Sequence, residues 1–201
     1  MKKIQLILIA NILFCLPCSK TIAQAPYKVS VGGVISPVIS VGVSCKTFFG
    51  ENVAFQIDLL VKDISTVYLK ENRNMPNMLS YGAFEQNVNL MYQKKAKDLK
   101  KVELFWFVGG GGSVGYAKKI DHTYGKFGVN VITGLEFVFK KVPLSIQIDL
   151  RPGYGVLSYY HYSDNYADAP MSHYPKSSTL HHFDWLTGFT FRYAFKGKEK
   201  E

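Results

Sequence analysis

The sequence predicts an all-β protein, an eight-stranded antiparallel up-and-down transmembrane β-barrel. Polar and apolar residues alternate with a period of two along most of the chain, as in strands with two different faces. After residue 23 there is no apolar run long enough for a membrane-spanning helix, and aromatic residues make up 14% of the sequence. Eight segments carry the alternation, at residues 28–35, 39–48, 53–62, 83–92, 102–116, 127–139, 144–151 and 183–195.

The first 23 residues have the features of a secretory signal peptide. Lys2 and Lys3 give a basic start, residues 4–17 are apolar, and Thr21 and Ala23 are small residues at the −3 and −1 positions of a cleavage site. A retained N-terminal anchor helix is the alternative, but the apolar stretch is short for one. We expect a signal peptide at 1–23 and one barrel domain at 24–201, ending in a short periplasmic tail at 196–201.

The segment Leu144–Arg151 shows the alternation most clearly, with apolar residues at even positions and Ser, Gln, Asp and Arg at odd positions. Across the segments, large residues occupy the apolar faces, whereas Gly, Ser, Ala and Thr are common on the polar faces. Small residues suit the narrow interior of an eight-stranded barrel. We therefore expect the apolar faces to meet lipid and the polar faces to point inward. A soluble sandwich, with its polar faces in water, is the alternative.

The polar faces carry charges of both signs. Because buried charge requires compensation, we expect these side chains to pair across the interior of the barrel. The predicted luminal charge network comprises Lys46, Asp58, Lys62, Glu85, Glu103, Glu136, Asp149, Arg151, Asp184 and Arg192.

The lengths of the connections predict an orientation. Short turns are expected at 49–52 and 140–143, with a slightly longer basic turn at 94–101. Outer-membrane barrels have short periplasmic turns and longer external loops. The predicted location is therefore the outer membrane of a Gram-negative bacterium, with both termini in the periplasm. Longer connections, expected outside the cell, alternate with the turns at 63–80, 117–126 and 158–181.

The stretch Thr133–Phe139, followed by Val142–Pro152 and the closing Gly188–Phe195, resembles the small outer-membrane β-barrel family of Gram-negative bacteria, the OmpA/OmpX-type barrels. The resemblance covers the chain after the signal peptide. It implies contact with outer-membrane lipid and lipopolysaccharide, and help from the barrel-assembly machinery during biogenesis. It brings no catalytic residue. Family members normally end on an aromatic residue, whereas this chain continues from Phe195 to Glu201.

The last long connection is rich in Tyr and His, and Tyr combines a large contact area with a polar tip. We expect a contact surface for an unknown extracellular partner here, formed by Tyr159, Tyr160, His161, Tyr162 and Tyr166. The spacing of the histidines in this region is irregular and does not predict a metal site. The glycines at 110–115 match a dinucleotide-binding pattern but extend a strand, with no following helix, so no cofactor is predicted.

The predicted function is a structural or surface-interaction role in the outer membrane, without enzymatic activity, cofactor or nucleic-acid partner. One alternative is a lipid- or peptide-modifying enzyme at the extracellular rim, because serines, histidines and acids share the last connection and its flanks. A second alternative is a soluble, lipocalin-like periplasmic barrel that binds an apolar ligand. The residues considered for the enzyme are Ser158, Ser163, His161, His182, Asp164 and Asp184.

Overall fold

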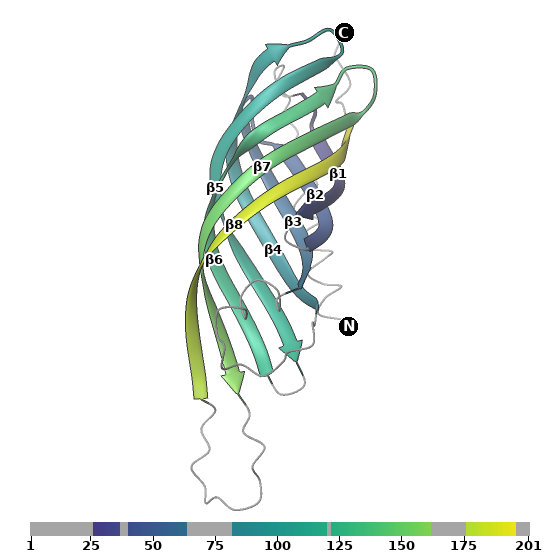
Figure 1. Ribbon diagram of the computed structural model, residues 1–201. Helices are drawn as coiled ribbons and strands as arrows, with labels where there is room; N and C mark the ends of the chain where they lie inside the picture. The colour runs from purple at the N-terminus through teal and green to yellow at the C-terminus, as the bar shows by residue number, and fades with distance from the viewer. Residues whose placement is uncertain (1–25, 37–39, 64–81, 120–121, 162–175, 196–201) are drawn as a thin grey trace, which may run out of the picture.

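The computed structural model describes residues 26–36, 40–63, 82–119, 122–161 and 176–195. These residues form eight antiparallel strands in a closed barrel, in which each strand pairs with its neighbours in sequence and β1 pairs with β8 (Figure 1). The predicted fold class, all-β with eight antiparallel strands, is confirmed. The strands are β1 (Val29–Ser36), β2 (Ser40–Phe48), β3 (Val53–Asp63), β4 (Gly82–Asp98), β5 (Val102–Lys119), β6 (His122–Phe139), β7 (Leu144–His161) and β8 (Lys176–Phe195).

The strands are strongly tilted, as the pairing register shows. The register can be followed around the barrel from Ile35 of β1 by moving to the paired residue on each next strand in turn. This path ends at Thr179 of β8. Ile35 itself pairs with Phe189 of β8. The shear of the barrel is therefore ten residues (189 minus 179). For eight strands about 4.8 Å apart this corresponds to a tilt of about 40°, within the usual range for barrels.

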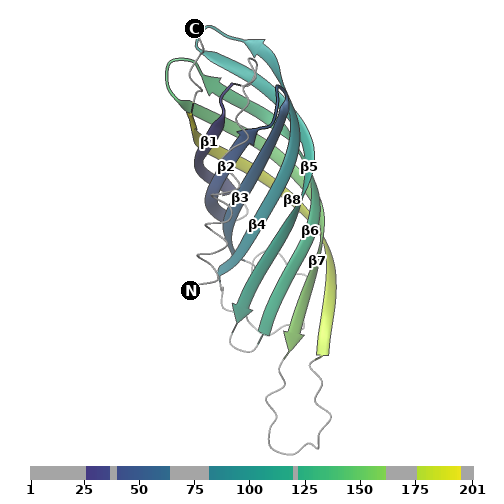
Figure 2. The same cartoon turned by 180° about the vertical axis from the view of Figure 1, so that it is seen from behind.

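Strand length divides the molecule into a closed part and a projecting part. β1, β2 and β3 have 8, 9 and 11 residues, whereas β5 to β8 have 18 to 20. The long strands run past the ends of the short ones and form a curved sheet beyond the barrel (Figures 1 and 2). In this projection, residues 176–188 of β8 pair with β7, and the described pairing gives them no partner on the other side.

The long strands correct the predicted connections. β4 continues to Asp98, β5 to Lys119 and β7 to His161, while β6 begins at His122. Most of the connection expected at 117–126 is therefore strand, as are the first residues of the turn expected at 94–101. Alternation of polar and apolar residues indicates a strand with one buried face. The pattern is therefore weaker where a hairpin extends beyond the closed barrel. Residues 64–81 and 162–175, within two other expected loops, lie outside the described residues.

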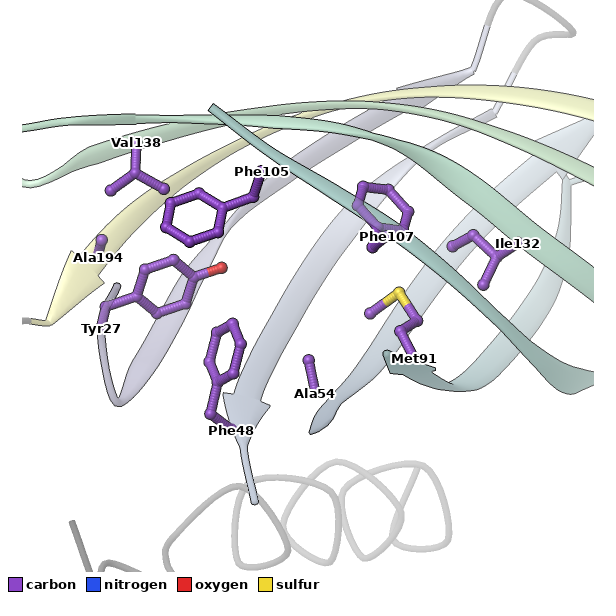
Figure 3. Close-up of a cluster of buried hydrophobic side chains, with 9 residues drawn as sticks. All are labelled: Tyr27, Phe48, Ala54, Met91, Phe105, Phe107, Ile132, Val138 and Ala194. Atoms are coloured by element: carbon purple, nitrogen blue, oxygen red, sulfur yellow. The ribbon is translucent and has the colours of Figure 1, made fainter. Parts of the chain in front are cut away.

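Nine apolar side chains fill part of the interior, near the short turns (Figure 3). The expectation that large apolar residues all face outward is wrong, because Phe105, Phe107 and Ile132 are almost fully buried. Inward-facing glycines make the room. A Cβ on Gly134 would lie 2.7 Å from the Phe107 ring and 2.1 Å from the Ile148 carbonyl oxygen. The full cluster is Tyr27, Phe48, Ala54, Met91, Phe105, Phe107, Ile132, Val138 and Ala194.

No helix within the described parts of the chain is both long enough and apolar enough to span a membrane.

Candidate functional site

The polar interior is organised around the carboxylate of Glu136 on β6. The Tyr27 hydroxyl donates to one carboxylate oxygen at 2.6 Å. Lys46 Nζ and Gln93 Nε2 each donate to the other oxygen at 2.8 Å, and Arg192 Nη1 lies 3.4 Å from the first oxygen. Four side chains from different parts of the barrel thus converge on one buried anion, which joins β2, β4, β6 and β8 across the interior.

A second group surrounds Arg151 on β7. Its guanidinium contacts Asp58 at 2.5 Å and Asp149 at 2.6 Å. The Gln147 amide links this group to the first one, since it donates to Asp149 at 2.8 Å and accepts from Arg192 at 3.0 Å. The two groups therefore form one continuous network, in which each ion pair is supported by further hydrogen bonds, as buried charges require.

A third group lies on the strand segments nearer the long connections. Lys126 Nζ is 3.1 Å from a carboxylate oxygen of Glu85. Asn130 Nδ2 donates to Asn89 Oδ1 at 2.7 Å, while Asn89 Nδ2 and Asn130 Oδ1 have no hydrogen-bond partner in the structure. A small pocket opens beside these groups, lined by Glu85, Asn87, Ser113, Gly128, Val129, Asn130, Arg151, Gly153 and Tyr154.

The buried charges balance. Among the residues that the structure describes, the buried charged side chains are four cations and four anions. An interior with paired charges, hydrogen-bonded amides and an apolar cluster holds the strands together from within. The balanced set is Lys46, Lys126, Arg151 and Arg192 against Asp58, Glu85, Glu136 and Asp149.

Seven of the ten members of the predicted charge network come together in these three groups, whereas Glu103 does not. Glu103 is half-buried near the short turns, where it accepts a hydrogen bond from Lys95 at 2.6 Å. Lys62 and Asp184 lie within β3 and β8, and their side chains are outside the description. Those inside the network are Lys46, Asp58, Glu85, Glu136, Asp149, Arg151 and Arg192.

The side chains of the predicted loop contact surface lie outside the part of the chain that the structure describes. Tyr159, Tyr160 and His161 belong to the end of β7, but their side chains are outside the description, and Tyr162 and Tyr166 fall outside the described residues. The same holds for most residues of the alternative enzyme site. Within the described parts, no three His, Cys, Asp or Glu side chains gather as a metal site would require.

The predicted network was limited to charged residues and so left out the inward amides of Gln56 and Gln147, and it also left out one cation, Lys126. Gln56 precedes Asp58 by two residues and Gln147 precedes Asp149 by two, so each amide shares a strand face with its acid. Lys126 shares the inward face of Gly128. Each of these three residues lies two positions before a residue already assigned to the polar face. Including every polar residue at that spacing, charged or not, would have added Gln56, Gln147 and Lys126 to the predicted interior. Tyr27 precedes the first strand, and no alternation marks it.

The outer surface is the reverse of the interior. Twenty-eight large apolar and aromatic side chains on the described strands and turns are exposed, among them Phe127 at 62% and Tyr193 at 53%. Several form aromatic pairs: the ring centroids of Tyr92 and Trp106 are 5.8 Å apart, and those of Tyr193 and Phe195 are 4.8 Å apart. An outer belt of this kind surrounds the closed part of the barrel.

These features define a class: an eight-stranded, antiparallel, closed β-barrel with a charged interior and an apolar exterior. Comparison of the chain with known protein families, with curated proteins and with solved structures finds no match. The case for a function therefore depends on the geometry of the barrel itself.

Proposed function

We propose that this protein is an outer-membrane β-barrel of a Gram-negative bacterium, of the OmpA/OmpX type, with a structural or surface-interaction role. One observation carries the proposal: large apolar side chains cover the outside of the closed barrel, while its inside holds eight buried charges among the described residues. The predicted signal peptide supports export, and the aromatic residues along β8 support assembly in the outer membrane.

The distribution of side chains favours lipid over water as the surrounding medium. Soluble monomers rarely expose contiguous apolar patches larger than a few hundred Å². In lipid the same surface is an advantage, and the closed ladder leaves no unpaired sheet edge within the barrel. A soluble ligand-binding barrel would need its apolar side chains inside, around a cavity. Here paired charges occupy much of that space.

The dimensions also fit a bilayer. Tilted strands of about 9 to 11 residues cross the hydrocarbon core, and β2 and β3 have 9 and 11 residues. The short turns would then face the periplasm. The projecting ends of β5 to β8 and their connections would stand outside the cell, where the Tyr- and His-rich segment after β7 offers a contact surface.

The filled interior supports an interaction role over a diffusion channel. Two linked groups of ion pairs and nine apolar side chains occupy the interior from the short turns to the middle of the barrel. Eight strands leave an interior just wide enough for side chains. The protein would therefore act through the surfaces that it presents on either side of the membrane.

The experiment is a heat-modifiability gel on fractionated cells that express the full chain. We expect recovery in the outer-membrane fraction, and a mobility that shifts on boiling because the closed barrel resists detergent until heated. A variant with Gly134→Val provides a control, because its side chain would clash with the β7 backbone and prevent closure. Recovery of the parent protein in the soluble periplasm, without a shift, would overturn the proposal and favour the soluble barrel.

A further inference from the structure

A cluster of lysines occupies one part of the short-turn end of the barrel. It lies on the turn between β4 and β5 and the turn between β6 and β7, together with the adjoining strand ends. All its members are exposed. We call this surface the basic patch; it consists of Lys94, Lys95, Lys97, Lys100, Lys101, Lys140 and Lys141.

The two turns that carry the basic patch are joined to each other. The Lys140 N–H donates to the Lys101 carbonyl at 3.1 Å, and the Lys140 side chain forms an ion pair with Asp98. Within the first turn, the Leu99 N–H donates to the Val102 carbonyl at 2.9 Å. The register shifts between Lys95 and Lys97, which marks a β-bulge there. The lysines thus share one fixed surface.

The basic patch has an excess of positive charge. Its seven lysines face two acids, Asp98 and Glu103, which leaves a net charge of +5 (seven minus two). Lys95 contacts Glu103 at 2.6 Å and lies 4.0 Å from Asp98, so these acids are already engaged by Lys95 and Lys140. Elsewhere on the described part of this end, Lys28 and Glu51 balance each other.

The outer apolar belt reaches the basic patch without a gap. Lys94 pairs with Trp106, whose ring contacts Tyr92, and both rings lie on the outer face. At the turn tips, Leu99 is 40% exposed and Val142 is 47% exposed. Aromatic rings followed by lysines and exposed aliphatic tips are typical of the boundary between hydrocarbon and lipid headgroups, where long lysine side chains reach toward anionic groups.

We propose that the basic patch binds the headgroups of anionic phospholipids in the leaflet that the short turns face. This inference rests on the proposed membrane location. The continuity of the patch with the belt favours a lipid over an acidic protein, because Lys94 lies beside the outward rings of Tyr92 and Trp106, where the headgroup region would begin. The phosphates would gather around the β4–β7 side of the barrel, since most of the excess lysines lie there.

The test measures which lipid surrounds Trp106. The full-length barrel with Trp185→Phe, which leaves Trp106 as its single tryptophan, is refolded into vesicles of phosphatidylcholine with a minor share of phosphatidylglycerol. Brominated acyl chains are placed on one lipid or the other. We expect brominated phosphatidylglycerol to quench Trp106 about twofold more than its bulk share predicts, and less at about 1 M salt, where charges are screened within about 3 Å.

Two variants give the matched comparison. Gln at Lys94, Lys97, Lys100, Lys101 and Lys141 should return the quenching to the bulk share, whereas Arg at the same five positions should retain the preference. The inference would be overturned if brominated phosphatidylglycerol quenched Trp106 of the parent protein only in proportion to its bulk share. It would also be overturned if the Gln variant kept the excess quenching. The salt dependence of the parent decides the matter if the Gln variant does not fold. Absence of quenching by brominated phosphatidylcholine would instead mean that the barrel is not inserted, and the proposed function would fail.

Discussion

The interior near the short turns and the interior near the long connections are built differently. Near the short turns, Glu136 has four polar partners and lies beside a nine-residue apolar cluster. Toward the long connections, Glu85 pairs with Lys126 and lines a small pocket together with Asn130, whose Oδ1 has no hydrogen-bond partner in the structure. Eight paired strands enclose the first region, whereas the second adjoins the projecting sheet. Closure of the barrel thus goes together with a continuous network of charges and an apolar cluster, whereas a small pocket remains beside the projecting sheet.

The largest expected effect tests the charge at the centre of the dense region. Glu136→Gln would leave Lys46 and Arg192 buried with one anion too few, so we expect a loss of about 3–5 kcal/mol in the free energy of unfolding. Glu85→Gln is the matched change beside the pocket, which Glu85 itself lines, and should cost about 1–2 kcal/mol because water entering the pocket can reach the altered side chain. Urea unfolding in lipid vesicles measures both. Equal losses would contradict the contrast between the two regions.

The next effect compares the inside of the barrel with the outside. Phe107 is fully buried and Phe127 is 62% exposed on the outer face. Phe107→Ala should cost about 3 kcal/mol, because the cavity left in the apolar cluster can collapse only partly. Phe127→Ala removes no interior contact and should cost less than about 1 kcal/mol in vesicles, since lipid chains fill the space. A larger loss for Phe127 than for Phe107 would reverse the assignment of the faces.

The smallest effect concerns the exposed rim. The hydrogen bond from Lys140, together with its charge, holds the pKa of Asp98 below its ordinary value. The contribution of this pair to stability is therefore present above the ordinary carboxyl range and is lost as the pH falls through the lowered pKa of the folded state. Carbon NMR titration of the Asp98 carboxyl should show this shift, and Lys140→Gln should raise the pKa again. Because the pair is exposed, global stability should hardly change.

The difference between the two regions also marks the limits of the sequence. Alternation predicted eight strands, the inward face and seven of the buried charges, because burial of one face imposes a period of two. The same alternation underestimated the lengths of β4 to β8. A sheet that projects beyond a closed barrel does not have to bury one face, so it need not follow a period of two. Alternation also missed the inward places of Phe105 and Phe107, and that of Phe107 depends on Gly134 of the neighbouring strand.

The sequence by itself determined the all-β class, the number of strands and the polar and apolar faces of most strands, because these depend on residues close together in the chain. The tertiary structure decided the partners: that Lys46 meets Glu136 across the interior, that Arg151 joins Asp58 to Asp149, and that Lys140 joins two turns. Strand alternation shows which face of the sheet a side chain occupies. It does not show the height of that side chain along the barrel axis relative to residues of other strands. That height is set by the shear of the closed barrel, a property of all eight registers together.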